Sequence, residues 1–102
     1  MKLPKKVKIG HRNFSIKVVP ELFDEGKEIQ GITNFDDKTI TILKRSDFTA
    51  VLMHEIEHGI LRHLGISEAL SDKEEEIIVE GLANMHIELI KDNPFLIPLL
   101  KK

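Results

Sequence analysis

The stretch TITILKRSDFTAVLMHEIEHGI, residues 39–60, changes its periodicity part-way along. Its first five residues, Thr39–Leu43, alternate threonine with isoleucine, as the two faces of a half-buried strand do. From Ser46 onward the apolar residues recur every three or four positions, which is typical of a helix. We therefore predict a strand and then a helix that is capped by Ser46, runs to about Leu64 and ends at Gly65.

The period of two extends from this stretch toward the N-terminus. Apolar and polar residues alternate at Phe14, Ile16 and Val18. Turn-forming residues at Gly10–Asn13 and Asp36–Lys38 predict two hairpins, whereas the polar stretch 20–28 predicts a loop or a short helical turn. These signals indicate a small antiparallel sheet of three or four strands.

A second helix is expected toward the C-terminus. Ser71–Glu74 has the spacing of a capping box, and the helical pattern continues to about Lys91, where Asn93-Pro94 stops it. The predicted fold class is α+β, with the sheet followed by two long helices. Residues 1–94 would form a single domain, and the short apolar tail 95–102 would pack on it.

The composition excludes several classes of protein. The chain has 102 residues and a formal net charge of -2, so no overall basic charge favours nucleic acid or acidic lipid. It has no cysteine, so a transition-metal site would have to use His, Asp and Glu. We find no apolar stretch long enough for export or for a membrane span, and we expect a cytoplasmic protein.

Two histidines in the first predicted helix are placed to share a metal ion. His54 and His58 lie about 40° apart around a helix axis and one turn from each other, so both imidazoles can reach one ion. Glu55 points to the side of that ion, where it could hydrogen-bond a water without being a ligand. His-Glu-x-x-His is the zinc-peptidase motif, and its alternative interpretation is a solvated polar helix face.

A catalytic zinc ion needs a third protein ligand. His63 would point away from the other two histidines if the helix continues. Glu80, in an apolar run of the second helix, is our predicted third ligand, because a carboxylate there needs a partner or a cation. Glu76, one turn earlier on the same side, stays open as the alternative, and Asn84 is expected to hydrogen-bond the free nitrogen of a ligand histidine.

These residues resemble a known family. His54-Glu55-x-x-His58, followed by a second-helix glutamate with a polar residue four positions later, is similar to the glutamate-zincins. The short length and VEGLANMHIELIKDNP, residues 79–94, resemble the minimal metallopeptidases of the ImmA/IrrE kind, many of them phage-encoded. The resemblance covers roughly residues 29 to 94. It implies zinc ligands His54, His58 and Glu80, Glu55 as the catalytic base, and a host-cell cytoplasmic location if the chain is phage-encoded.

The expected activity is hydrolysis of a peptide or protein by metal-activated water, with no nucleic-acid or membrane partner. An extended substrate could pair with the strand Thr39–Leu43 if that strand is an edge. Zincins commonly stabilise the oxyanion with Tyr or His, and this chain has no tyrosine. The remaining candidates are His11, Arg12, Arg62, His63 and His86. Two alternatives stay open, a zinc-stabilised binding module without turnover and an α+β domain without metal.

Overall fold

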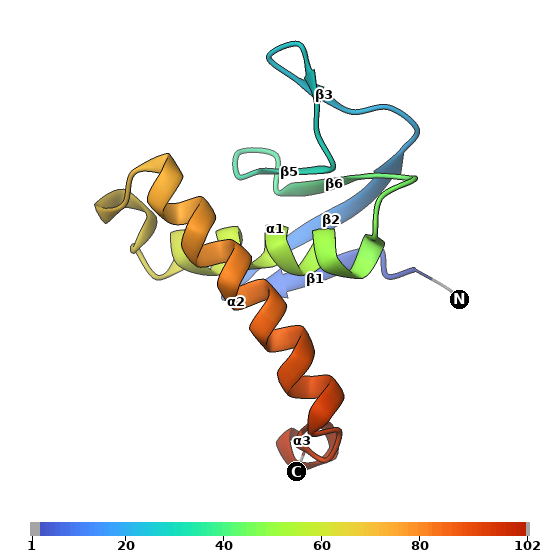
Figure 1. The fold of residues 1–102 in the computed structure, drawn as a ribbon, viewed down its shortest axis with the longest axis vertical. Coiled ribbons are helices and arrows are strands. Elements are labelled where there is room, and N and C mark those ends of the chain that lie inside the picture. The colour runs from blue at the N-terminus through green and yellow to red at the C-terminus, as the bar shows by residue number, and fades with distance from the viewer. Residues whose placement is uncertain (1–2, 102) are drawn as a thin grey trace.

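The computed structural model describes residues 3–101 as a sheet half followed by a helical half (Figure 1). The strands are β1 (Lys6–Ile9), β2 (Arg12–Val19), β3 (Phe23–Asp24), β4 (Lys27–Glu28), β5 (Gly31–Asn34) and β6 (Thr39–Leu43). The helices are α1 (Phe48–His63), α2 (Asp72–Asp92) and α3 (Leu96–Leu100), with a 3-10 turn at Ser67–Ala69 between α1 and α2. The predicted α+β class is confirmed.

Four of the strands form one sheet in the order β1-β2-β6-β5. Both predicted hairpins, β1–β2 and β5–β6, are antiparallel, but β2 and β6 are parallel. The prediction of a wholly antiparallel sheet was therefore wrong at one pair, because β5 comes between β2 and β6 in the chain and reverses its direction. The strand Thr39–Leu43 is also no edge, since it lies between β2 and β5, and β5 is the edge on its side of the sheet.

The stretch predicted as a loop or helical turn contains a second, two-stranded sheet. β3 and β4 pair as a hairpin whose two turn residues, Glu25 and Gly26, have φ of 51° and 79°. Positive φ at both central residues is the geometry of the tight hairpin turn that matches strand twist. The period-two signal is weak here because each strand has only two residues.

Helix α1 covers one face of the sheet and closes the core. Its Val51 packs against Ile40 and Ile42 of the central strand, both fully buried. Asp47 rather than Ser46 is its cap, since the Asp47 side chain accepts from the backbone N–H of Ala50. The Ser46 hydroxyl instead donates to the carbonyl of Leu43, at the end of β6.

Helix α2 crosses α1 and then extends beyond it (Figure 1). Only Val79 and Ala83 of its residues are buried. The tail does form a helix, α3, but at the far end of α2, where Phe95 is 60% exposed and Leu100 is 77% exposed. The tail therefore does not pack on the domain as expected, because α2 carries it away from the sheet.

The start of α2 has both hydrogen bonds of the predicted capping box. The Ser71 hydroxyl accepts from the N–H of Glu74, and the Glu74 carboxylate accepts from the N–H of Ser71. The backbone N–H of Ser71 and, to a smaller extent, its hydroxyl hold the pKa of the Glu74 carboxyl below its ordinary value. The cap fixes the residue at which α2 begins.

We expect Ser71→Ala to lower the free energy of unfolding by about 1 kcal/mol, because the N–H of Glu74 loses its acceptor. Urea denaturation followed by circular dichroism measures this loss. An unchanged midpoint would mean that the packing of α2 on α1, rather than the cap, determines where the helix begins.

Candidate metal centre

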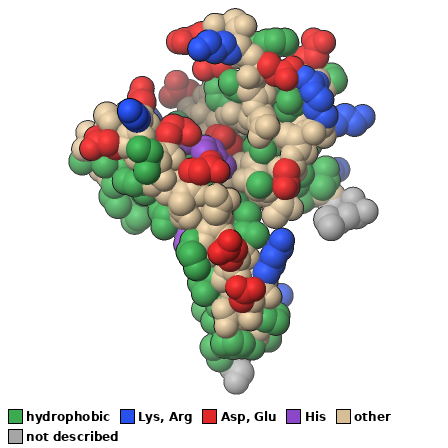
Figure 2. Space-filling view, viewed as in Figure 1, with side chains coloured by type: hydrophobic (Ala, Val, Ile, Leu, Met, Phe, Trp, Pro, Cys, Tyr) green, Lys and Arg blue, Asp and Glu red, His purple; other side chains and the backbone are tan. Residues whose placement is uncertain are grey.

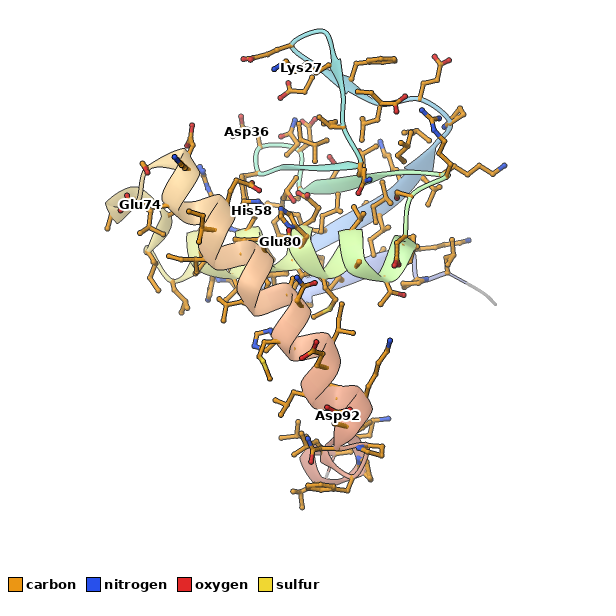
Figure 3. The ribbon with its side chains drawn as sticks, in the orientation of Figure 1. Lys27, Asp36, His58, Glu74, Glu80 and Asp92 are labelled. Atoms are coloured by element: carbon orange, nitrogen blue, oxygen red, sulfur yellow. The ribbon has the colours of Figure 1, made fainter. Side chains whose placement is uncertain are left out.

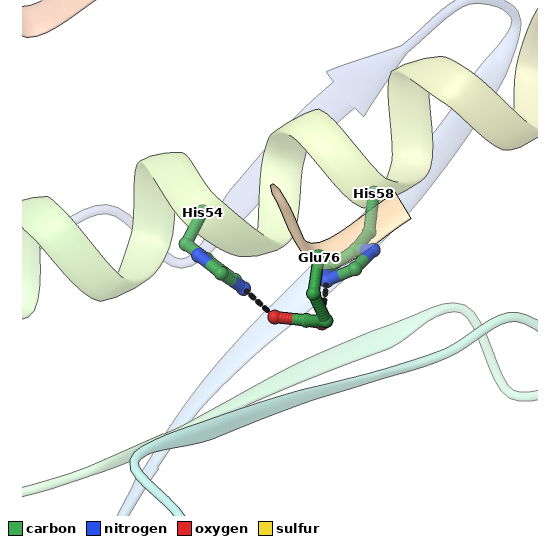
Figure 4. A group of neighbouring side chains, drawn as sticks. All are labelled: His54, His58 and Glu76. Carbon is green, nitrogen blue, oxygen red and sulfur yellow. Dashed lines mark ion pairs between the residues drawn. The ribbon is translucent and has the colours of Figure 1, made fainter. Parts of the chain in front are cut away.

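His54 and His58 project from α1 toward the first turns of α2, and both meet Glu76 there (Figure 4). The Nε2 atom of His54 lies 3.2 Å from one carboxylate oxygen of Glu76, and the Nε2 of His58 lies 2.8 Å from the other. One potential ligand atom from each of the three residues falls within 4.8 Å of the others. The three side chains therefore form a possible metal-binding triad.

The other nitrogen of each ring contacts a different carboxylate of α2. Glu80 lies 2.9 Å from Nδ1 of His54, and Glu75 lies 2.6 Å from Nδ1 of His58. A carboxylate at Nδ1 favours the tautomer with the proton on that atom, which leaves the lone pair on Nε2. Both lone pairs then face the same point beside Glu76.

Glu75 is held in its ionised form. Burial raises the pKa of its carboxyl, but the hydrogen bonds from His58 and Ser67 and the nearby positive charge of Arg62 more than offset this, so the pKa lies below its ordinary value. An ionised Glu75 is a steady acceptor for the His58 ring, which it orients.

The dimensions of the triad suit a tetrahedral ion. Two nitrogen or oxygen ligands, each about 2.0–2.1 Å from zinc at the tetrahedral angle, lie about 3.3 Å apart. The two distances to Glu76, 3.2 and 2.8 Å, are near that value, although each is measured to a different carboxylate oxygen. The same distances also fit a cluster of protonated imidazoles and carboxylates without metal, which is what the metal-free alternative predicts.

The group of three that could hold an ion together contains Glu76, the alternative left open, rather than the predicted Glu80. Glu80 contacts the other ring nitrogen of His54. Glu80 does not lie in an apolar environment, because its side chain is 64% exposed to solvent and contacts His54. Asn84, expected on a ligand histidine, donates instead to Glu80 at 3.4 Å. The α2 residue that contacts both histidines thus lies one helical turn earlier in the sequence than predicted.

Glu55 lies beside the triad and is buried at 6% exposure. Its carboxylate accepts a hydrogen bond of 2.7 Å from the hydroxyl of Thr33 on the edge strand β5. The strand approaches this closely because of Gly31, where a Cβ atom would lie 2.5 Å from a methyl group of Val51. No local pattern predicts this role of Thr33, since the contact joins residues 22 positions apart.

The triad opens into two clefts that follow β5. One cleft, with a volume of about 340 Å³, lies on the His54 and Glu80 side, and the other, of about 290 Å³, lies on the His58 side. Both are lined by Gly31, Glu55 and Glu76, so they meet beside the triad. Figure 2 shows histidine side chains at the bottom of this hollow with acidic groups around them, and Figure 3 shows His58 and Glu80 where α2 crosses α1.

The cationic candidates for an oxyanion donor lie elsewhere, with one exception. The His63 ring packs against Gly10 and His11, and His86 contacts Glu57. The guanidinium of Arg62 stacks 4.4 Å from the ring centre of Phe35, which lines the second cleft. Arg62 is therefore a candidate that contacts a residue lining a cleft.

A buried carboxylate on α1 that is hydrogen-bonded to a histidine of α2 escaped the sequence analysis. Glu57 is 2% exposed, and its carboxylate lies 2.5 Å from Nδ1 of His86 on α2. The polar pattern HEIEH does not indicate that Glu55 and Glu57 are buried. Both are buried, on different sides of the helix. Burying a carboxylate this fully without a hydrogen-bonding partner would cost folding free energy.

We expect His86→Leu to lower the free energy of unfolding by about 1–3 kcal/mol, because it leaves the Glu57 carboxylate unpaired. The double variant Glu57→Met with His86→Leu should recover most of that loss, since no charge is then buried. Urea denaturation of the three proteins gives both values. A double variant less stable than His86→Leu alone would contradict a role for the pair and would indicate lost packing.

No family model, curated protein or solved structure matches this chain. No helix within residues 3–101 is long and apolar enough to cross a membrane. Function must therefore be argued from the site.

Proposed function

We propose that this chain is a zinc-dependent metallopeptidase that holds zinc through His54, His58 and Glu76. The observation that carries the proposal is that each imidazole contacts two carboxylates. Its Nδ1 atom contacts an orienting glutamate, and its Nε2 atom contacts Glu76. Orienting carboxylates of this kind accompany metal-ligating histidines in proteins. The resemblance of the motif to the glutamate-zincins adds to this support.

The donor set favours zinc over other ions. Two imidazoles with one carboxylate are a usual ligand set of catalytic zinc, whereas calcium and magnesium prefer oxygen ligands alone. Three protein ligands would leave the fourth position of a tetrahedral zinc to water, as catalytic zinc requires. Bound zinc would supply a Lewis acid that polarises a carbonyl and lowers the pKa of a water ligand to near 7.

Glu55 is the group that would move protons in this reaction. Its carboxylate lines both clefts beside the triad and is buried, so little solvent competes for it. It would accept a proton from the attacking water and deliver it to the leaving amine. The Thr33 hydroxyl holds one of its oxygens, which leaves the second free for this transfer.

The substrate would be an extended peptide laid along β5. Within residues 3–101 no further strand pairs with the outer edge of β5, so its backbone groups can pair with an added strand. The two clefts on either side of Glu55 would take side chains from the two sides of the cleaved bond. The sheet order excludes Thr39–Leu43 from this role, because that strand lies inside the sheet.

The binding module without turnover remains the second candidate function. The lack of any tyrosine favours it, because no phenol can donate to an oxyanion. It shares the zinc ligands and gives Glu55 only the structural role of bonding Thr33.

Elemental analysis tests the step common to both functions. We expect about one zinc per chain after purification without chelator, because the site provides three preorganised ligands. Removing the ion with a chelator should lower the melting temperature, since zinc binds the folded chain alone. A His58→Ala protein that keeps its full zinc content would contradict the assignment.

A further inference from the structure

The first cleft, on the His54 and Glu80 side of the triad, has an acidic lining. Glu55 and Glu76 line it and also line the second cleft. Asp47 and Glu80 line only the first cleft. In the described part of the chain, no lysine or arginine lines either of the two clefts. Four carboxylates therefore share the first cleft, and no ammonium or guanidinium group of its lining offsets their charge.

Bound zinc, as proposed above, would leave part of this negative charge in place. The two positive charges of the ion would be offset by its ligand Glu76 and by Glu55 beside it. Asp47 and Glu80 then remain as an excess of negative charge in the first cleft. The N-terminus of α1 offsets some of the Asp47 charge, because the N–H of Ala50 donates to one of its oxygens. Such an excess favours a cationic group in whatever enters the cleft.

Apolar side chains share the first cleft with these carboxylates. Ile29, Ala50 and Val51 contribute to its lining. Its volume of about 340 Å³ lies in the range of ligand-binding clefts, which is about 300–1,000 Å³. A lining of both kinds suits lysine and arginine, because their methylene stems contact apolar groups while their charged ends pair with a carboxylate.

A deeply buried polar group also opens into this cleft. Glu55 is only 6% exposed, and the Thr33 hydroxyl donates to one of its carboxylate oxygens. Within residues 3–101 the other oxygen has no hydrogen-bond partner, although the residue lines the cleft. Buried polar groups are nearly always hydrogen-bonded, so this oxygen is available to a group that comes from outside the chain.

We propose that the substrate is a peptide with a lysine or arginine side chain on one side of the cleaved bond, and that this side chain enters the first cleft. The inference rests on the proposed function, because it assigns a substrate class to the same site. The second cleft adds one carboxylate, Asp24, to the shared pair, and Ile32 and Phe35 make more of its lining apolar. The preference for a basic side chain therefore belongs to the first cleft.

Binding of three labelled peptides to the zinc-loaded wild type tests this preference. The peptides are alanine-based and have lysine, norleucine or glutamate at the centre; norleucine has the stem of lysine without its charge. Stopped-flow fluorescence anisotropy measures binding before turnover, and mass spectrometry shows whether a peptide has been cut. We expect the lysine peptide to bind at least about fivefold more tightly than the norleucine peptide, and the glutamate peptide to bind most weakly. High salt should reduce these differences.

Asp47→Asn tests which cleft is responsible. Asparagine caps a helix as well as aspartate does, so the variant removes the charge and keeps the start of α1. We expect the preference for lysine over norleucine to fall about twofold to threefold. Asp37→Asn is the matched control, because Asp37 is exposed in the β5–β6 turn and lines neither cleft. This control should keep the full preference.

The outcomes separate this inference from the proposed function. Equal binding of the lysine and norleucine peptides, or a preference that Asp47→Asn leaves unchanged, would overturn the substrate class even if the wild type cuts peptides. A preference for lysine that Asp47→Asn reduces, without any cleavage, would support the basic peptide as the ligand and would contradict the peptidase.

Discussion

Glu76→Gln is expected to lose zinc that the wild type retains. The variant replaces the one charged ligand of the triad by a neutral amide of nearly the same volume. Zinc sites in small domains bind with about 10–16 kcal/mol in total, so loss of one ligand of this kind should weaken binding by roughly 10²–10⁴-fold. Competition with a chromophoric chelator measures the affinity directly.

The matched control is Glu80→Gln. Glu80 contacts Nδ1 of His54 and does not point its carboxylate at the shared point, so its loss should weaken zinc binding by about 10–100-fold at most. Glu74→Gln, in the capping box, should leave the affinity unchanged. If Glu80→Gln loses far more affinity than Glu76→Gln, the glutamate first predicted from the sequence is the ligand after all.

Glu55→Gln should keep the zinc and lose the cleavage. The amide can still accept from Thr33, so the fold and the metal content should survive. It cannot accept the proton of an attacking water, and the loss of a general base lowers the rate by roughly 10²–10⁴-fold. The assay is a peptide library or host-cell protein mixture, with fragments identified by mass spectrometry.

Two comparisons make this result interpretable. Cuts made by the wild type should disappear with a chelator. Glu88 is an exposed carboxylate near the end of α2, so Glu88→Gln should cleave as the wild type does. If the wild type cuts nothing, and binds a partner equally well with Gln at position 55, the binding module is the correct function.

Local sequence signals were enough to predict most of the elements. The capping box at Ser71, the turn residues at Asp36–Lys38 and the change of period after Leu43 each depend on a few neighbouring residues. The co-facial placement of His54 and His58 is equally local, because it follows from helix geometry alone. These predictions agree with the structure because tertiary contacts do not compete with them.

The features that could not be predicted from the sequence depend on how elements meet. Both Glu76 and Glu80 lie on the correct side of α2, and only the point at which α2 crosses α1 decides between them. A shift of one turn is 5.4 Å along the axis, which no periodicity within α2 can reveal. The burial of Glu57 depends on His86, 29 positions away in the chain. The parallel pairing of β2 with β6 depends likewise on the order of the strands within the sheet.

The most direct test of the central claim is a crystal structure of the zinc-loaded protein with anomalous data collected above and below the zinc absorption edge. We expect one peak about 2.0–2.2 Å from Nε2 of His54, from Nε2 of His58 and from a carboxylate oxygen of Glu76, with Glu80 on Nδ1 of His54. A peak bound by Glu80 in place of Glu76, or no peak between the two histidines, would contradict the account.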